Sequence, residues 1–196
     1  MHRPFRPNAL SKERMKEGSR GTRSPLLWFL LLPLILSCAS VPPNGKYKDA
    51  RIIGNVPFFP QEAYQCGPAS MAGVLNYWGL KITPGEIAAE IYSPNAKGTL
   101  DVDMVLYPER KGLQARQYRG SLEDLKANID SSRPLLVLVD DGFWVYEKAH
   151  FMVVVGYNAE GLIVNSGTEQ NQFIPQSRFL RSWERTKFWT LKITPK

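Results

Sequence analysis

Hydrophobic positions follow two different periods along the chain, and the helical period comes first. Apolar residues recur at three- and four-residue spacing from Met71 to Trp78, and Gly79 ends the pattern. This spacing predicts a helix that begins at Cys66 and buries one face. Pro68 fits its first turn, because no backbone N–H is needed there.

Capping sequences predict further helices. Thr83-Pro-Gly-Glu86 and Ser121-Leu-Glu-Asp124 each place a hydroxyl three residues before a carboxylate, which is typical of a helix N-terminus. The two helices with these sequences are predicted over residues 83–91 and 121–130. Two more helices, without such a sequence, are predicted over residues 101–109 and 176–185.

Most predicted strands lie late in the chain. PLLVLV at 134–139 and HFMVVVGY at 150–157 are short apolar runs typical of buried strands, and residues 158–161 predict a hairpin to 162–165. The remaining predicted strands cover residues 51–59, 113–119 and 188–193. Because helices come first and strands mostly later, we predict an α+β fold, with N-terminal helices packed on a C-terminal antiparallel sheet.

The charge distribution argues against a nucleic-acid partner. The chain has 196 residues and a net charge of +7, and its composition suits one globular domain plus an extra segment. The first 24 residues hold seven Lys or Arg and two Glu, which leaves 18 basic and 16 acidic residues for the rest. No basic stripe interleaved with aromatic residues remains to bind a phosphate backbone. We therefore expect no nucleic acid.

The basic leader runs into an apolar segment, residues 25–37, that is too short for a transmembrane helix of about 20 residues. A basic region, a short apolar core and a small residue before the cut describe a secretory signal. Ile35-Leu-Ser-Cys38 resembles a bacterial lipobox, which implies an acylated cysteine at the mature N-terminus. We predict a lipoprotein signal peptide over 1–37 with lipidation at Cys38. The alternatives are a signal-anchor or an ordinary signal peptide, with Met15 as a second possible start.

The residues after Cys38 predict how the domain is held. Ser40 resembles the sorting residue of outer-membrane lipoproteins, so we expect a lipid-anchored protein of the bacterial cell envelope, at the outer membrane and facing the periplasm. Residues 38–50 predict a Pro/Gly/Lys linker, and 51–196 predict one domain.

Two residues dominate the candidate chemistry. With Cys38 lipidated, Cys66 is the one free thiol, and with His2 in the leader, His150 is the one histidine. A thiol at a helix N-terminus meets unpaired N–H groups and the positive end of the helix dipole, which favour thiolate. Next to an imidazole it forms a thiolate–imidazolium pair, a strong nucleophile. Each residue alone is more often structural: a buried apolar cysteine, or a histidine satisfied by hydrogen bonds.

Two more residues complete the predicted site. Asn165 ends the partner strand of the hairpin, where we expect its side chain to accept a hydrogen bond from the His150 ring and fix the tautomer. The oxyanion needs the Cys66 N–H and a second donor, from Gln61 or Gln65. Gln61 is favoured, because five residues give it room to fold round the site.

Acidic residues give no sign of a metal site. Asp140 and Asp141 are interpreted as solvated loop residues, and they lack histidine or cysteine partners at usable spacing. We expect no metal and no cofactor.

Two segments resemble one family. Val56-Pro-Phe-Phe-Pro-Gln61 followed by Tyr64-Gln-Cys-Gly-Pro-Ala-Ser70, and His150-Phe-Met-Val-Val-Val-Gly-Tyr157, are similar to peptidase C39 and its stand-alone, exported C39-like relatives. The resemblance spans about residues 52–195. It implies a papain-like fold, with Cys66 as nucleophile, His150 as base and Gln61 as oxyanion donor. It also implies an orienting acid about 15 residues after the histidine, at Asn165.

Two departures from the family pattern leave two hypotheses. Gln61 lies five residues before Cys66 where six is usual, and Asn165-Ser-Gly stands where Asp-Pro is usual. The first hypothesis is a membrane-anchored cysteine peptidase that hydrolyses a peptide or amide bond of a peptide or protein substrate. The second is a catalytically inactive C39-like module that binds peptides in the envelope, with a possible envelope protein as partner.

Overall fold

The computed structural model describes residues 47, 49–61, 65–142 and 148–196. All of them belong to one unit of the chain, residues 42–196. The predicted signal peptide, Cys38 and most of the linker lie outside the described residues.

The helices expected from apolar spacing and capping form close to the predicted bounds. In the described residues these are α1 (Cys66–Tyr77), α2 (Pro84–Ile91), α3 (Asp101–Arg110), α4 (Leu122–Asp130) and α5 (Gln176–Glu184). Thr83 and Ser121 cap α2 and α4, as predicted, each accepting a hydrogen bond from a backbone N–H of the first turn. Among the described residues, no helix is long and apolar enough to cross a membrane.

The strands of the described residues form two antiparallel sheets. The small sheet pairs β2 (Tyr92–Ser93) with β3 (Gly98–Thr99). The large one is built from β1 (Arg51–Ile52), β4 (Gln114–Arg119), β5 (Leu135–Asp140), β6 (Ala149–Tyr157), β7 (Gly161–Ser166), β8 (Glu169–Pro175) and β9 (Trp189–Thr194). Its order is β4-β9-β5-β6-β7-β8, with β1 on β6, and every pair is antiparallel.

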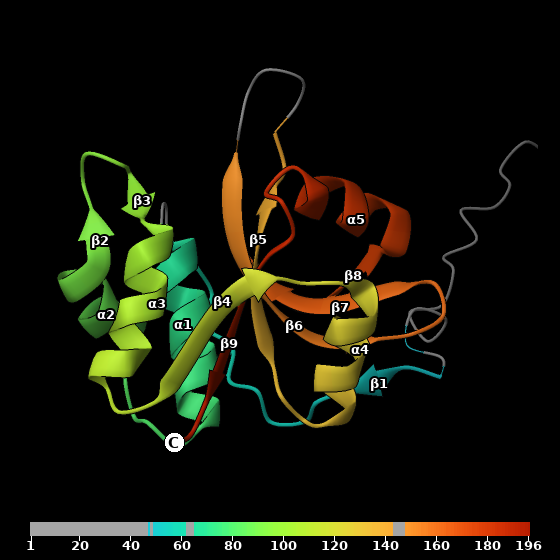
Figure 1. Cartoon of the computed structure of the whole chain (residues 1–196), viewed down its shortest axis with the longest axis horizontal. Helices are drawn as coiled ribbons and strands as arrows, with labels where there is room; N and C mark the ends of the chain where they lie inside the picture. The colour runs from blue at the N-terminus through green and yellow to red at the C-terminus, as the bar shows by residue number, and fades with distance from the viewer. Residues whose placement is uncertain (1–46, 48, 62–64, 143–147) are drawn as a thin grey trace, which may run out of the picture. The chain divides into compact units, whose positions relative to one another are not determined.

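Helices cover both faces of the large sheet. Figure 1 shows α1, α2 and α3 gathered on one side of it and α4 and α5 on the other. The core on both sides is apolar, with Leu75 of α1, Leu136 of β5 and Trp183 of α5 fully buried. The α+β fold with helices on an antiparallel sheet is therefore confirmed, although β1 precedes all the helices and only α1 to α3 precede the other strands of the large sheet.

Strand predictions were less accurate at the edges. The strand predicted over 51–59 is paired only at Arg51 and Ile52, because the chain turns at Gly54 and Asn55, where Asn55 has a φ of 60°, and Pro57 farther on cannot donate to a ladder. Edge strand β8 was not predicted, because its first residues, Glu169-Gln-Asn-Gln172, lack an apolar alternation.

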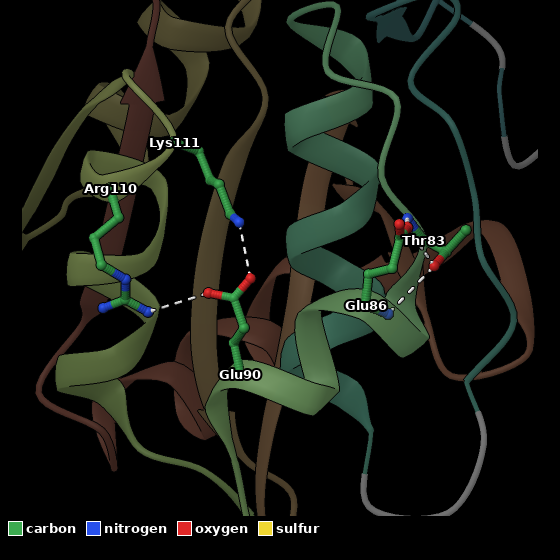
Figure 2. Close-up of polar contacts among 5 residues, drawn as sticks. All are labelled: Thr83, Glu86, Glu90, Arg110 and Lys111. Carbon is green, nitrogen blue, oxygen red and sulfur yellow. Dashed lines mark hydrogen bonds and ion pairs between the residues drawn. The ribbon is translucent and has the colours of Figure 1, made fainter.

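Polar contacts join α2 to α3. At the start of α2 the Glu86 N–H donates to Thr83 Oγ1 (3.3 Å), and the Thr83 N–H donates to the Glu86 carboxylate (2.7 Å), as Figure 2 shows. At its other end Glu90 pairs with Lys111 (2.8 Å), just after α3, and lies 4.0 Å from Arg110, the last residue of α3. The contacts of Glu90 therefore link α2 to the end of α3.

The capping box gives a stability prediction. Thr83→Ala removes the acceptor for the Glu86 N–H, so we expect the free energy of unfolding to fall by about 1 kcal/mol. Thr83→Ser keeps the hydroxyl and should retain most of the stability. Urea denaturation of the three proteins checks this, and equal losses for Ala and Ser would show that the hydroxyl does not cap α2.

Candidate active site

The site is positioned by α1, which packs against β6. Near the start of the helix the Ser70 hydroxyl donates to the Phe151 carbonyl oxygen across 3.2 Å, and Ser70 is buried. Near its end the Tyr77 hydroxyl donates to the Ser132 carbonyl oxygen (2.8 Å), just before β5. Because the first residue of β5 pairs with Val154, the helix and β6 run in the same direction.

This direction places Cys66 and His150 at the same end of the α1–β6 pair. Cys66 precedes Ser70 by one helical turn, about 6 Å along the axis. His150 precedes Phe151 by one residue, about 3.8 Å between Cα atoms. Both residues are half-buried, and Cys66 packs against the edge of the core. Cys66 and His150 therefore lie at the same end of the helix–strand pair.

The N-terminus of α1 has backbone N–H groups that can donate hydrogen bonds to a ligand. Gln65 makes no side-chain cap, and the first turn holds no acidic residue. The N–H groups of Cys66 and Gly67 have no partner within the helix and carry the positive end of its dipole. Gly67 itself is required by close packing, because a Cβ there would lie 2.9 Å from the Thr99 side chain.

The His150 ring is held by Ser166, which the sequence did not suggest. Its Nε2 lies 2.8 Å from the Ser166 hydroxyl oxygen. Both side chains lie on one face of the sheet, because Met152, two residues after His150, faces the same hollow as Ser166. Asn165 pairs with Val153 and therefore points to the other face. The expected position of Asn165, directly across from His150, is not what the structure shows.

A β-bulge explains the difference. Tyr157 pairs with Leu162. If this register continued along the strands, Asn165 would lie opposite Val154 and its side chain would share a face with His150. The register shifts between Val154 and Gly156, so Val154 pairs with Val164 instead. Because side chains alternate along a strand, a slip of one residue exchanges the two faces. The bulge thus brings Ser166 to His150.

Asn165 instead lies on the side of Gln61. Its Oδ1 accepts a hydrogen bond from the Asn171 N–H (3.0 Å), and its side chain is buried. Asn165, Gln61 and Ser70 line a hollow of about 10 Å³, close to the volume that one water molecule needs. The Gln61 N–H donates to the Gly167 carbonyl oxygen (3.0 Å), which ties the segment before α1 to the end of β7.

Burial sets the protonation of His150. Desolvation lowers the pKa of the imidazole below its ordinary value of 6.5, and Lys148 lowers it further. The nearby Asp141 acts in the opposite direction, but the pKa remains lowered overall. The ring is therefore neutral at pH 7 and can accept a proton.

Asp140, interpreted from the sequence as solvated, is buried. Its Oδ1 accepts hydrogen bonds from the N–H groups of Gly142 and Lys148, both at 2.8 Å, and its Oδ2 pairs with Arg185 at 2.8 Å. Burial raises the pKa of this carboxyl, but these donors together hold it below its usual value. Asp140 thus holds Gly142 and Lys148 near the start of β6.

No cluster of three or more metal-ligating side chains occurs among the described residues. The region holds a thiol, an imidazole, a hydroxyl and two amides, which are groups suited to covalent catalysis by a cysteine.

The sequence matches one family over most of its length. Residues 53–190 match the Peptidase_C39 like family. Two curated relatives match over shorter stretches, and both are described as uncharacterized proteins. That of Methanothermobacter thermautotrophicus is 36% identical over 66 residues, 34% of this chain and 46% of the relative. That of Methanothermobacter marburgensis is 35% identical over 65 residues, 33% of this chain and 45% of the relative. The matched segment thus spans less than half of either relative.

Solved structures share the fold. A candidate C39-like peptidase from Bacillus anthracis has a TM-score of 0.63 at 18% identity, covering 76% of this chain and 98% of that one. The peptidase domain of Streptococcus ComA, a bifunctional ABC transporter of a quorum-sensing pathway, has a TM-score of 0.61 at 21% identity, with 72% and 100% covered. A double glycine motif protease from an AMS/PCAT transporter, in complex with a leader peptide, has a TM-score of 0.58 at 22% identity, with 74% and 96% covered.

The lowered pKa of His150 makes stability depend on pH. Because the pKa of His150 is lower in the folded chain than in the unfolded chain, the unfolded chain binds a proton more readily there below pH 6.5. The free energy of unfolding should therefore fall as the pH is lowered from 6.5, and His150→Gln should reduce that slope. Urea denaturation from about pH 8 to about pH 5 measures it. Identical slopes in the two proteins would contradict the lowered pKa.

Proposed function

The chain belongs to the Peptidase_C39 like family, and on that premise we propose that it is a cysteine peptidase that hydrolyses a peptide or amide bond. The observation that carries the proposal is the parallel course of α1 and β6, which sets Cys66 and His150 at one end of the pair. The fold shared with C39-like peptidases agrees with this chemistry.

His150 acts as the base through its second ring nitrogen. When Nε2 carries the hydrogen and donates it to the Ser166 hydroxyl oxygen, Nδ1 keeps its lone pair. The lowered pKa keeps the ring neutral, so Nδ1 can take the Cys66 proton as the sulfur attacks. Ser166 then serves as the positioning residue, in the role expected for Asn165.

The negative charge of the tetrahedral intermediate falls on the substrate carbonyl oxygen. The N–H of Cys66, at the positive end of α1, is one donor for it, and the Gln61 side-chain amide is the second. Asn165 lies beside Gln61 in the small hollow, where it supports the oxyanion side of the site. His150 then protonates the leaving amine, which leaves an acyl group on Cys66. A water deprotonated by His150 releases the acyl group and restores the thiol.

A second candidate function is a module that binds peptides without cleaving them. The observation that favours it is the neutral Ser166 hydroxyl at Nε2 of His150, because a hydroxyl stabilises an imidazolium less than a carboxylate does. The same fold and surface then serve recognition of a peptide or of an envelope protein.

We also propose that the domain is held at a membrane by lipid. Ile35-Leu-Ser-Cys38 supports acylation at Cys38, Ser40 supports sorting to the outer membrane facing the periplasm, and residues 38–50 supply the tether.

The reactivity of Cys66 distinguishes peptidase from binding module. We expect iodoacetamide to alkylate Cys66 near pH 6 at least tenfold faster than free cysteine, because His150 accepts the thiol proton. His150→Ala should reduce the rate to that of free cysteine, and peptide mass spectrometry reads the modified residue. A rate equal to that of free cysteine, unchanged in His150→Ala, would refute an activated pair.

Matched variants separate the two candidates for orienting His150. Ser166→Ala should slow alkylation of Cys66, while Asn165→Ala should leave it closer to the native rate. The reverse order would return the orienting role to Asn165.

The lipid anchor is tested by mass spectrometry of the intact protein. Protein isolated from membranes should begin at Cys38 and carry acyl chains, and Cys38→Ser should lack them and stay uncleaved at that site. An intact leader, or a cut elsewhere with Cys38 unmodified, would refute the lipoprotein assignment.

A further inference from the structure

Helix α5 presents an arginine face next to the candidate site. Phe179 and Trp183 are fully buried beneath it. Arg178 and Arg181 are exposed, and their spacing of three places them on one outward face. Arg185 follows in the next turn, on the same face. The helix is thus anchored by aromatic residues and cationic outside.

One of the three arginines is already occupied. Arg185 pairs with the buried Asp140 (2.8 Å) and donates to the Gly142 carbonyl oxygen (2.6 Å). Among the described residues, neither Arg178 nor Arg181 makes an ion pair or a side-chain hydrogen bond. Arg185 therefore ties the end of α5 to Asp140 and Gly142, and the guanidinium groups of Arg178 and Arg181 remain available.

The two free arginines line adjoining hollows that reach the site. One hollow, of about 250 Å³, is bordered by Ser166 and Arg178. The other, of about 170 Å³, is bordered by Arg178, Arg181 and Arg185. Arg178 and Ser182 border both. A path of hollowed surface therefore leads from Ser166, which contacts His150, to the arginine face.

The balance of charge favours an anion in the outer hollow, whereas acidic residues outnumber Arg178 in the inner one. Asp141 borders both hollows and Glu169 borders the inner one. Asp140 is neutralised by Arg185, which leaves Asp141 alone against two unpaired guanidinium groups in the outer hollow. Guanidinium groups bind carboxylates through paired hydrogen bonds, which adds orientation to the attraction.

We propose that Arg178 and Arg181 bind a carboxylate of the peptide substrate, a few residues from the scissile bond. The proposal rests on the peptidase function proposed above and adds a substrate class to it. The carboxylate belongs either to an acidic side chain or to a free peptide C-terminus. Both sources present the same group, and the test separates them.

The test uses fluorescence-quenched peptide libraries. The peptides are random except for one position, fixed as Glu or Gln, and each library is made with a free or an amidated C-terminus. Cleavage rates are compared for native protein, Arg178→Gln/Arg181→Gln and Arg133→Gln. Arg133 is an exposed arginine before β5, away from both hollows, and serves as the matched control. Thermal unfolding verifies that the variants fold.

We expect native protein to favour one carboxylate-bearing library over its neutral partner by roughly threefold to fivefold, as for exposed ion pairs. The double variant should bring that ratio close to one, and Arg133→Gln should keep it. Faster cleavage of the Glu library than of the Gln library shows that the bound carboxylate is an acidic side chain. Faster cleavage of peptides with a free C-terminus than of amidated peptides shows that it is the C-terminal carboxylate. Cleavage without either preference, or a preference that survives in the double variant, overturns the proposal.

A binding measurement separates this proposal from the peptidase function. The same libraries are passed over immobilised Cys66→Ala protein, with and without the two arginine substitutions, and retained peptides are quantified by mass spectrometry. Arginine-dependent retention of acidic peptides without cleavage by native protein keeps the carboxylate site and refutes the peptidase. Absence of both cleavage and retention refutes both.

Discussion

The packing of α1 along β6 is the constraint on which the candidate site depends. The buried Ser70 hydroxyl on the Phe151 carbonyl oxygen sets how far the helix is advanced along the strand. One turn before this contact is Cys66, and one residue before it is His150. A shift of the helix by one turn, about 5.4 Å, would move Cys66 away from the end of β6 at which His150 lies.

Burial then determines which protonation state the pair starts from. Desolvation of His150 lowers its pKa and favours the neutral ring, which fits a histidine that takes the thiol proton during attack better than a preformed ion pair. The ion pair between the buried Asp140 and Arg185 contributes by tying the end of β5 and Gly142 to the end of α5. The same pair leaves Arg178 and Arg181 free at the edge of the site.

Local signals in the sequence predicted the helices, because capping and apolar spacing act within a few residues. Thr83 and Ser121 were identified as caps for this reason. Cys66 and His150 were found from residue counts, since the predicted mature chain offers no other free thiol and no other histidine. The partner of His150 was missed because it depends on register. A bulge near Val155 changes which side chains of β7 share a sheet face with His150. The local sign of it in the sequence is Gly156, where the packing is so close that a Cβ would lie 2.7 Å from the Arg51 carbonyl oxygen.

The most direct test of the pairing between Cys66 and His150 is the titration of the His150 ring before and after the thiol is blocked. The ring is followed by NMR, and methyl methanethiosulfonate caps Cys66 with a neutral group. If the two side chains are in contact, capping removes an ionisable neighbour and adds bulk that excludes water, so the midpoint should move to lower pH. An unchanged midpoint would show that the thiol and the imidazole do not interact and would contradict the account.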